Sequence, residues 1–195
     1  MKTSRQVLIT ALVVFLIIIS GSCQSRHGTP VPSDTQIFTN ADGFSFALPD
    51  NWRDVTGNDL GEIVRSTNPS IMFVAIAELP DENALFSVSG YDMGETMTID
   101  SAFMKSLNTK GTLSGEPLVN YRVIDHGIRS RDDKILRYKI SFNPETKYSI
   151  IYYIMKNHAS RFLYELKAVC ESEAALTGLQ ESLEEVVMSS GFSER

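Results

Sequence analysis

The chain has 195 residues, of which 43% are hydrophobic and 22% are charged, and its formal net charge is −6. These values exclude a disordered or fibrous protein and suffice for one globular domain with a sizeable core. The acidic balance argues against nucleic-acid binding, because neutralisation of phosphates supplies most of that affinity and the sequence has no run of clustered Lys and Arg. We therefore expect no nucleic-acid partner.

The N-terminal residues have the pattern of an export signal. Lys2 and Arg5 form a short positive region, residues 7–19 are apolar apart from Thr10, and small residues lead to Cys23. This order predicts a secretory signal peptide over residues 1–22. The apolar stretch is short for a membrane span, which needs roughly 20 apolar residues, so an uncleaved transmembrane anchor is the weaker alternative.

The residues before Cys23, Ile19-Ser20-Gly21-Ser22, resemble a bacterial lipobox. The resemblance implies cleavage before Cys23 and attachment of diacylglycerol to its sulfur. Ser20 departs from the pattern, which usually has Leu there, and a plain secretory signal stays an alternative. Each interpretation puts the domain outside the cytoplasm, and Gln24 implies an outer membrane, facing the periplasm, if the cell has two membranes.

Residues 23–36 are predicted to form the lipidated Cys23 and a flexible tether, because they are polar and contain Gly and two Pro. A lipidated Cys23 leaves Cys170 as the other thiol of the chain. Alternation along residues 162–170 points Cys170 toward the core, where a thiol is a small, inert hydrophobic group.

The first half of the domain is predicted from alternation and turn residues. Residues 37–48 are expected to form a hairpin, and strands are expected at 62–67 and 71–78, the second being apolar enough for a central strand. A short helix capped by Asp100, or by Thr98 before it, is expected to end near residue 108.

The second half is predicted to be an antiparallel meander followed by a helix. Its strands are expected at residues 118–129, 134–142, 147–155 and 161–170. In the second of these, alternation puts Leu136, Tyr138, Ile140 and Phe142 inside and Arg137, Lys139 and Ser141 outside. The final helix begins near Ser172 and ends before Gly191, with an apolar stripe on one side.

The pattern from Asn40 to Trp52, in which Gly-Phe-Ser-Phe is followed by Leu-Pro and Trp, together with the closing helix, resembles the PsbP-like superfamily. The resemblance covers most of residues 37–192, predicted here as a single α+β domain. It implies an αβα sandwich, in which an antiparallel sheet of about six to seven strands is covered by helices on both faces. Members of the superfamily mostly bind partners, and no shared catalytic residues come with the fold.

Motifs that carry chemistry are not found in the sequence. Asp125 and His126 are adjacent on a predicted strand, so they point to opposite faces and cannot form one acid-base pair. Phosphate loops, nucleophile elbows and zinc-binding spacings are also missing. We therefore expect no catalytic residue, no metal site and no cofactor.

Residues 79–97 fit no clear period and are predicted to be a long loop that contains Leu85, Phe86 and Tyr91. Long loops are often functional, so these three side chains are candidates for binding a partner. The alternative, which we prefer, is a loop or short helix that tucks them over the sheet, because apolar residues are usually buried.

Two functional classes follow from the sequence. The first is a membrane-anchored, non-catalytic module that binds an envelope protein or acts as its accessory. The second is an extracytoplasmic carrier of a small or lipidic ligand held between sheet and helix. An apolar cavity of several hundred Å³ would favour the carrier, since ligand sites run about 300 to 1,000 Å³, and a packed interior would favour the binding module.

Overall fold

The computed structural model describes residues 36–108, 122–131, 134–144, 147–156 and 159–193. The predicted signal peptide, the lipidated Cys23 and the tether to residue 35 lie outside the described residues, as do residues 118–121 of a predicted strand and two of the three histidines. Among the described residues, no helix combines the length and apolar character that crossing a membrane requires.

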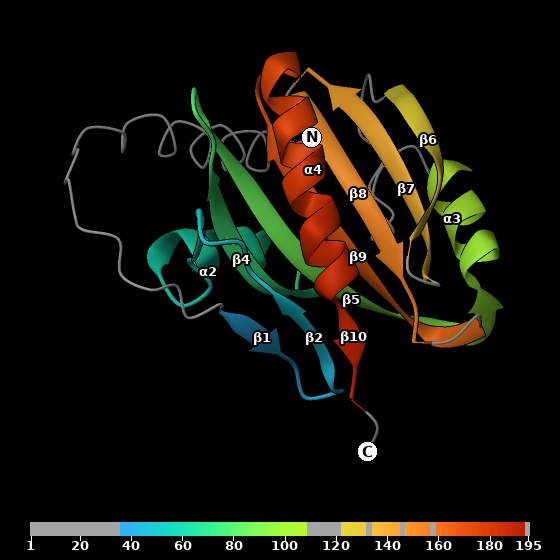
Figure 1. Cartoon of the computed structure of the whole chain (residues 1–195). Coiled ribbons are helices and arrows are strands. Elements are labelled where there is room, and N and C mark those ends of the chain that lie inside the picture. Colours follow the sequence, from blue (N-terminus) through green and yellow to red (C-terminus); the bar gives the residue numbers. More distant parts are fainter. Residues whose placement is uncertain (1–35, 109–121, 132–133, 145–146, 157–158, 194–195) are drawn as a thin grey trace, which may run out of the picture.

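The largest element is an antiparallel sheet of seven strands (Figure 1). Their order across the sheet is β3 (Trp52–Asp54), β4 (Ile71–Glu78), β5 (Asn83–Thr98), β9 (Ala159–Cys170), β8 (Lys147–Ile154), β7 (Lys134–Asn143) and β6 (Arg122–Arg131). The four strands predicted as a meander are β6 to β9, and short connections join them as expected. The long strands β5 and β9 lie in the middle of the sheet, and β3 and β6 form its edges.

One face of this sheet carries the main apolar core. The helix α4 (Glu173–Ser189) crosses this face, and a small sheet of β1 (Ile37–Thr39), β2 (Phe44–Ala47) and β10 (Gly191–Phe192) lies beside it (Figure 1). β1 and β2 form the predicted hairpin, with Phe38 opposite Phe46. The rings of Phe44 and Tyr164 stack with centroids 4.2 Å apart, which fixes the small sheet against β9.

The helix α4 begins at a side-chain cap. The Ser172 hydroxyl accepts a hydrogen bond from the Ala175 amide at 3.1 Å, which satisfies one of the free amides of the first turn. Leu179, Leu183 and Val186 are fully buried against the sheet, in agreement with the predicted stripe. Cys170, at the end of β9, is buried as predicted, and burial raises the pKa of its thiol to about 12.

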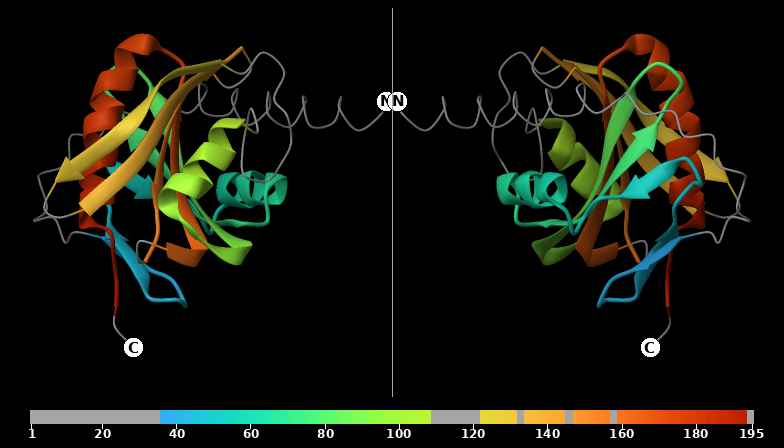
Figure 2. Two further views of the ribbon diagram at one scale, coloured as in Figure 1. Left: turned by 90° about the vertical axis from the view of Figure 1, so that its right-hand side faces the viewer. Right: turned by 90° about the vertical axis from the view of Figure 1, so that its left-hand side faces the viewer.

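Two short helices, α2 (Asp59–Thr67) and α3 (Ile99–Asn108), cover the opposite face (Figure 2). Val64 of α2 packs against Val74 and Ile76 of β4. Phe103 of α3 packs among side chains of β8 and β9 that include Tyr153 and Leu163. Helices therefore lie on both faces of an antiparallel sheet, which confirms the predicted α+β, αβα architecture.

Two predicted elements of the first half are wrong. The strand expected at 62–67 is part of α2, because the Asn58 side chain accepts a hydrogen bond from the Gly61 amide at 3.0 Å and begins a helix there. The loop expected at 79–97 is mostly β5. Alternation in β5 is hidden because both of its faces are covered and because its pairing with β9 shifts between Asp92 and Met97.

Candidate functional site

The three residues proposed for partner binding lie on the central strand β5. Phe86 is fully buried and Tyr91 is 9% exposed, whereas Leu85 is half-buried against the cluster beneath α2. Asn68 donates a hydrogen bond to the Tyr91 hydroxyl at 3.1 Å, and burial raises the pKa of that hydroxyl to about 12. The segment buries Phe86 and Tyr91, as the preferred alternative expected, but as part of a strand within the sheet rather than a loop or short helix over it. The partner-binding role of the three residues stays a prediction.

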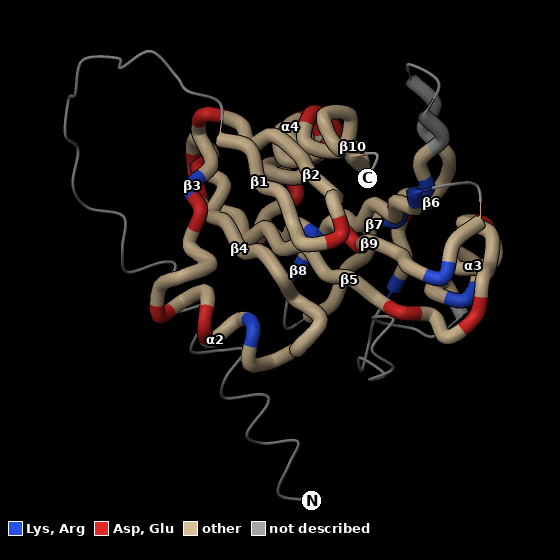
Figure 3. The backbone as a smooth tube through the Cα atoms, turned by 90° about the horizontal axis from the view of Figure 1, so that it is seen from below, with Lys and Arg blue, Asp and Glu red and all other residues tan. Residues whose placement is uncertain are grey.

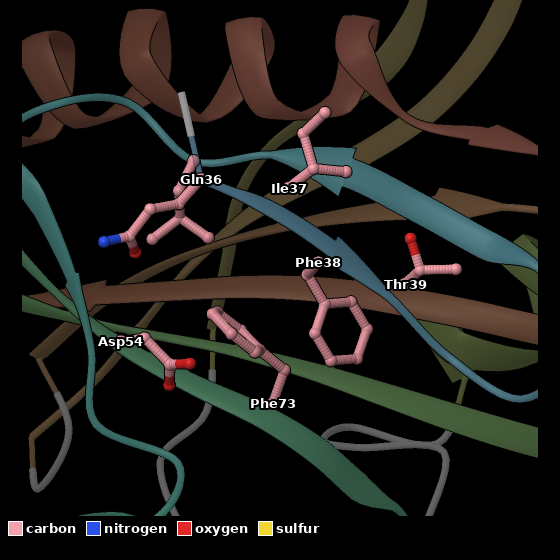
Figure 4. Close-up of a pocket in the computed structure, with 7 residues that line it drawn as sticks. Gln36, Ile37, Phe38, Thr39, Asp54 and Phe73 are labelled. Atoms are coloured by element: carbon pink, nitrogen blue, oxygen red, sulfur yellow. The ribbon is translucent and has the colours of Figure 1, made fainter. Parts of the chain in front are cut away.

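A cavity of about 460 Å³ lies between the small sheet and the edge of the large sheet (Figure 4). It is lined by Gln36, Ile37, Phe38, Thr39, Leu48, Asp54 and Phe73. The rings of Phe38 and Phe73 meet with centroids 4.8 Å apart, while Gln36 and Asp54 bring polar atoms to the same space. The cavity is therefore of mixed polarity, and it lies between two sheets rather than between sheet and helix.

Charged side chains are buried on the face that α2 and α3 cover. Lys139 of β7 is 0% exposed, and its ammonium group donates a hydrogen bond to the Ser106 carbonyl of α3 at 3.3 Å. Lys167 and Glu165 lie on β9. Glu165 is 2% exposed, and one of its carboxylate oxygens has no hydrogen-bond partner among the described residues, whereas Lys167 is half-buried. We call Lys139, Glu165 and Lys167 the buried charged cluster.

Burial controls the protonation of this cluster. It raises the pKa of Glu165 and lowers the pKa of Lys167, in both cases because the charged form loses its hydration. Burial also lowers the pKa of Lys139 to about 8, against a smaller opposing effect of the Glu165 charge. Each of these three groups therefore reduces the stability of the fold while it is ionised.

The buried charged cluster was not predicted from the sequence. The hydrophobic pattern puts Lys139 and Ser141 on the outside of β7, but Lys139 is 0% and Ser141 is 1% exposed. The alternation itself is correct, since Leu136, Tyr138 and Ile140 are in the main core. The prediction fails because a second layer covers the other face, so residues that alternate outward meet that layer rather than water.

The longest exposed edge in the described part of the chain belongs to β6. This strand has ten residues and pairs with β7 on one side, and no other described strand pairs with it. Ile124 and Ile128 are 46% and 52% exposed on it. At the opposite edge of the sheet, β3 has three residues. A long edge with exposed apolar side chains is a ready template for another chain.

The helix α3 lies next to this edge and adds to its apolar surface. Arg137, which is opposite Ile128 in the sheet, forms a salt bridge with Asp100 of α3 at 2.5 Å. Met104 follows Asp100 by one helical turn and is 54% exposed. We call Ile124, Ile128 and Met104, together with the edge of β6, the β6 surface, and it is the candidate functional site.

Asp125 and His126 of β6 confirm the prediction that they face opposite sides. The Asp125 carboxylate accepts a hydrogen bond from the Tyr138 hydroxyl at 3.0 Å, on the face of α4. The His126 ring lies 6.0 Å from the ring of Phe103, on the face of α3. In the described ranges, no group of three His, Cys, Asp or Glu side chains is placed to hold a metal ion.

Basic residues are marked on β6 and near α3, and acidic residues lie beside those near α3 (Figure 3). The strand β6 carries Arg122, Arg129 and Arg131 and one acid, Asp125. Acidic residues predominate on α2 and α4. The sequence of β6 is therefore basic, in a chain of net charge −6.

No family model matches the chain, and no curated protein matches it. Solved structures do resemble it. The solution structure of cyanobacterial PsbP (CyanoP) from Synechocystis matches with a TM-score of 0.54 and 14% identity, over 89% of this chain and all of that one. A crystal structure from Bacteroides thetaiotaomicron matches with a TM-score of 0.51 and 12% identity, over 84% of this chain and 50% of that one.

LpqN, involved in cell envelope biogenesis of Mycobacterium tuberculosis, has a TM-score of 0.45 and 13% identity, over 91% of this chain and 95% of that one. At these identities the first two matches establish the fold and nothing beyond it. The chain thus has a PsbP-like α+β fold, as the Asn40 to Trp52 pattern predicted.

Proposed function

We propose that the chain is a non-catalytic accessory module that binds an envelope protein and is held outside the cytoplasm by lipid on Cys23. The exposed β6 surface supports the binding role, because a ten-residue sheet edge with Ile124 and Ile128 exposed is suited to contact with a partner. The pattern of residues 1–23 supports the anchor, and Gln24 supports an outer membrane facing the periplasm where two membranes exist.

Photo-crosslinking in intact cells tests the binding role. A photoreactive side chain in place of Ile128 should form one discrete protein adduct, because it lies on the β6 surface. The same side chain in place of Gly178 is the control, since Gly178 is exposed on α4 and nothing lies within 4 Å of a Cβ added there. Identical adduct patterns at the two positions, or none at Ile128, would contradict the proposal.

Mass spectrometry of protein purified from membranes tests the anchor. We expect a chain that begins at Cys23 and carries a diacylglyceryl group, and we expect the Cys23→Ser variant to leave the membrane fraction. A chain that retains residues 1–22, or an unmodified Cys23 in membrane-bound protein, would rule out the lipid anchor.

A carrier of a small or lipidic ligand is the second candidate, and the cavity beside β1 supports it by size alone. Its volume of about 460 Å³ is within the range of ligand sites. Thr39→Trp should fill it and abolish co-purification of a stoichiometric ligand in solvent extracts, whereas Thr96→Trp, at an exposed position of β5, should not. Extracts of the unsubstituted protein that contain no ligand would exclude the carrier.

A further inference from the structure

We propose that β6 binds an extended, acidic segment of a partner protein by strand addition, so that the segment becomes an eighth strand of the large sheet. This inference rests on the proposed binding role and names the kind of partner. It depends on three properties of β6, which are an edge that pairs with no other described strand, its charge and its exposed apolar side chains.

The main chain of β6 supplies the first property. Its ten residues span roughly 33 Å, and in an antiparallel pair alternate residues direct their N–H and C=O groups away from the neighbour, so about five residues face outward. Proteins protect such edges with short strands, Pro, charged side chains or bulges. The edges β1, β3 and β10 have two or three residues each, whereas β6 is long and contains no Pro.

The charge of β6 selects among possible strands. Three Arg and one Asp give the strand a charge of +2, with His126 neutral, on a chain of net charge −6. A second copy of β6 would bring like charges together, which disfavours a dimer through this edge. An acidic segment is complementary, and its attraction to the edge raises the rate of encounter as well as the affinity.

The apolar side chains supply contacts beyond the main chain. Ile128 is opposite Arg137 in the sheet and Met104 is one helical turn from Asp100, so both lie on the α3 side, toward which alternate side chains of an added strand would point. A bulge between Val123 and Asp125 places Ile124 in an irregular part of the edge. The preferred segment therefore alternates acidic residues with apolar ones.

Fluorescence anisotropy with labelled ten-residue peptides tests the proposal. A peptide that alternates Val and Glu should bind, and one that alternates Val and Lys should bind at least about tenfold more weakly because of like charge. Methylation of the backbone nitrogens on the edge of the Val-Glu peptide that would hydrogen-bond to β6 should also abolish binding, because these nitrogens could no longer donate. Equal affinity for the acidic and basic peptides would overturn the proposal.

A matched pair of variants locates the binding edge. Arg122→Glu, at the exposed start of β6, should weaken binding of the Val-Glu peptide about fivefold or more, because an exposed charge contact contributes about 1 kcal/mol. Arg53→Glu makes the same change at an exposed position of the short edge β3 and should leave the affinity unchanged. Equal weakening by both variants would mean general charge attraction and would overturn strand addition.

Amide hydrogen exchange distinguishes a strand from other bound shapes. The Val-Glu peptide should slow exchange at every second residue of β6, because only outward amides gain partners. Protection without this period of two would refute strand addition. The two proposals can fail separately. An adduct at Ile128 in cells without alternating protection would refute strand addition and leave the binding role intact. Alternating protection without an adduct in cells would refute the binding role.

Discussion

Replacement of Lys139 by Met should stabilise the protein near pH 7. Burial lowers the pKa of Lys139 from 10.5 to about 8, and a shift of one unit corresponds to about 1.4 kcal/mol, so the ionised group costs the folded state about 3 kcal/mol. The substitution removes this cost and also the hydrogen bond to the Ser106 carbonyl, which contributes about 1 kcal/mol. We therefore expect a net gain of about 2 kcal/mol.

The pH dependence of this gain gives the sharper test. Because the folded pKa is the lower one, the unfolded chain binds more protons between pH 8 and 10.5, and stability rises with pH across that window. The advantage of Lys139→Met should therefore be largest at pH 7 and should shrink by about 1 kcal/mol per unit above pH 8. Below pH 8 it should be constant.

Urea unfolding at pH 7, 8, 9 and 10 measures this difference. Lys156→Met, at an exposed position, is the control and should change stability by no more than about 0.5 kcal/mol at any pH. A Lys139→Met variant that is less stable than the unsubstituted protein at pH 7, or whose advantage does not decline above pH 8, would refute the reasoning.

Three further predictions concern the core, the free thiol and a helix cap. Phe86→Ala should lower the free energy of unfolding by about 3–5 kcal/mol, because Phe86 packs against Trp52 and other rings, and Phe162→Ala, 52% exposed, should cost far less in the same denaturation assay. In a Cys23→Ser background, Cys170 should react with a thiol reagent at pH 8 about a thousandfold more slowly in the folded protein than in urea. The reason is that burial raises the pKa of the thiol from 9 to about 12. A similar rate in both states would contradict its burial. Asn58→Ala should cost about 1 kcal/mol in thermal unfolding by loss of the α2 cap, and an unchanged melting temperature would show that the cap contributes nothing.

The hairpin shows what the sequence could determine. The Asn40 side chain accepts hydrogen bonds from the amides of Asp42 and Phe44, each at 2.9 Å, and Gly43 adopts a φ of +80° that side chains rarely allow. These contacts are local, so the residue types alone predict the turn. The strands of the meander were predictable for the same reason, because hydrophobic alternation and turn residues fix each of them locally.

The elements that escaped prediction depend on tertiary contacts. The residues of α2 include β-branched Ile63 and Val64, which favour a strand, but Val64 is buried against β4 as part of the helix. Glu165 has the residue type of an exposed position, and no local pattern shows that a second layer covers it. For the same reason, the sequence could not show that β6 lies at an edge.

The buried charged cluster and the β6 surface are connected through the sheet. Lys139 is directly opposite His126 of β6, so a buried positive charge lies one strand behind the proposed docking edge. Buried charges are screened by salt less than exposed ones, so Lys139 should strengthen the attraction of β6 for an acidic strand. Lys139→Met should thus stabilise the fold and, at the same time, weaken binding of the Val-Glu peptide. Stability would then be gained at the expense of binding. Anisotropy titrations at pH 7 should show weaker binding by the more stable variant; unchanged affinity would mean that the cluster does not contribute to recognition.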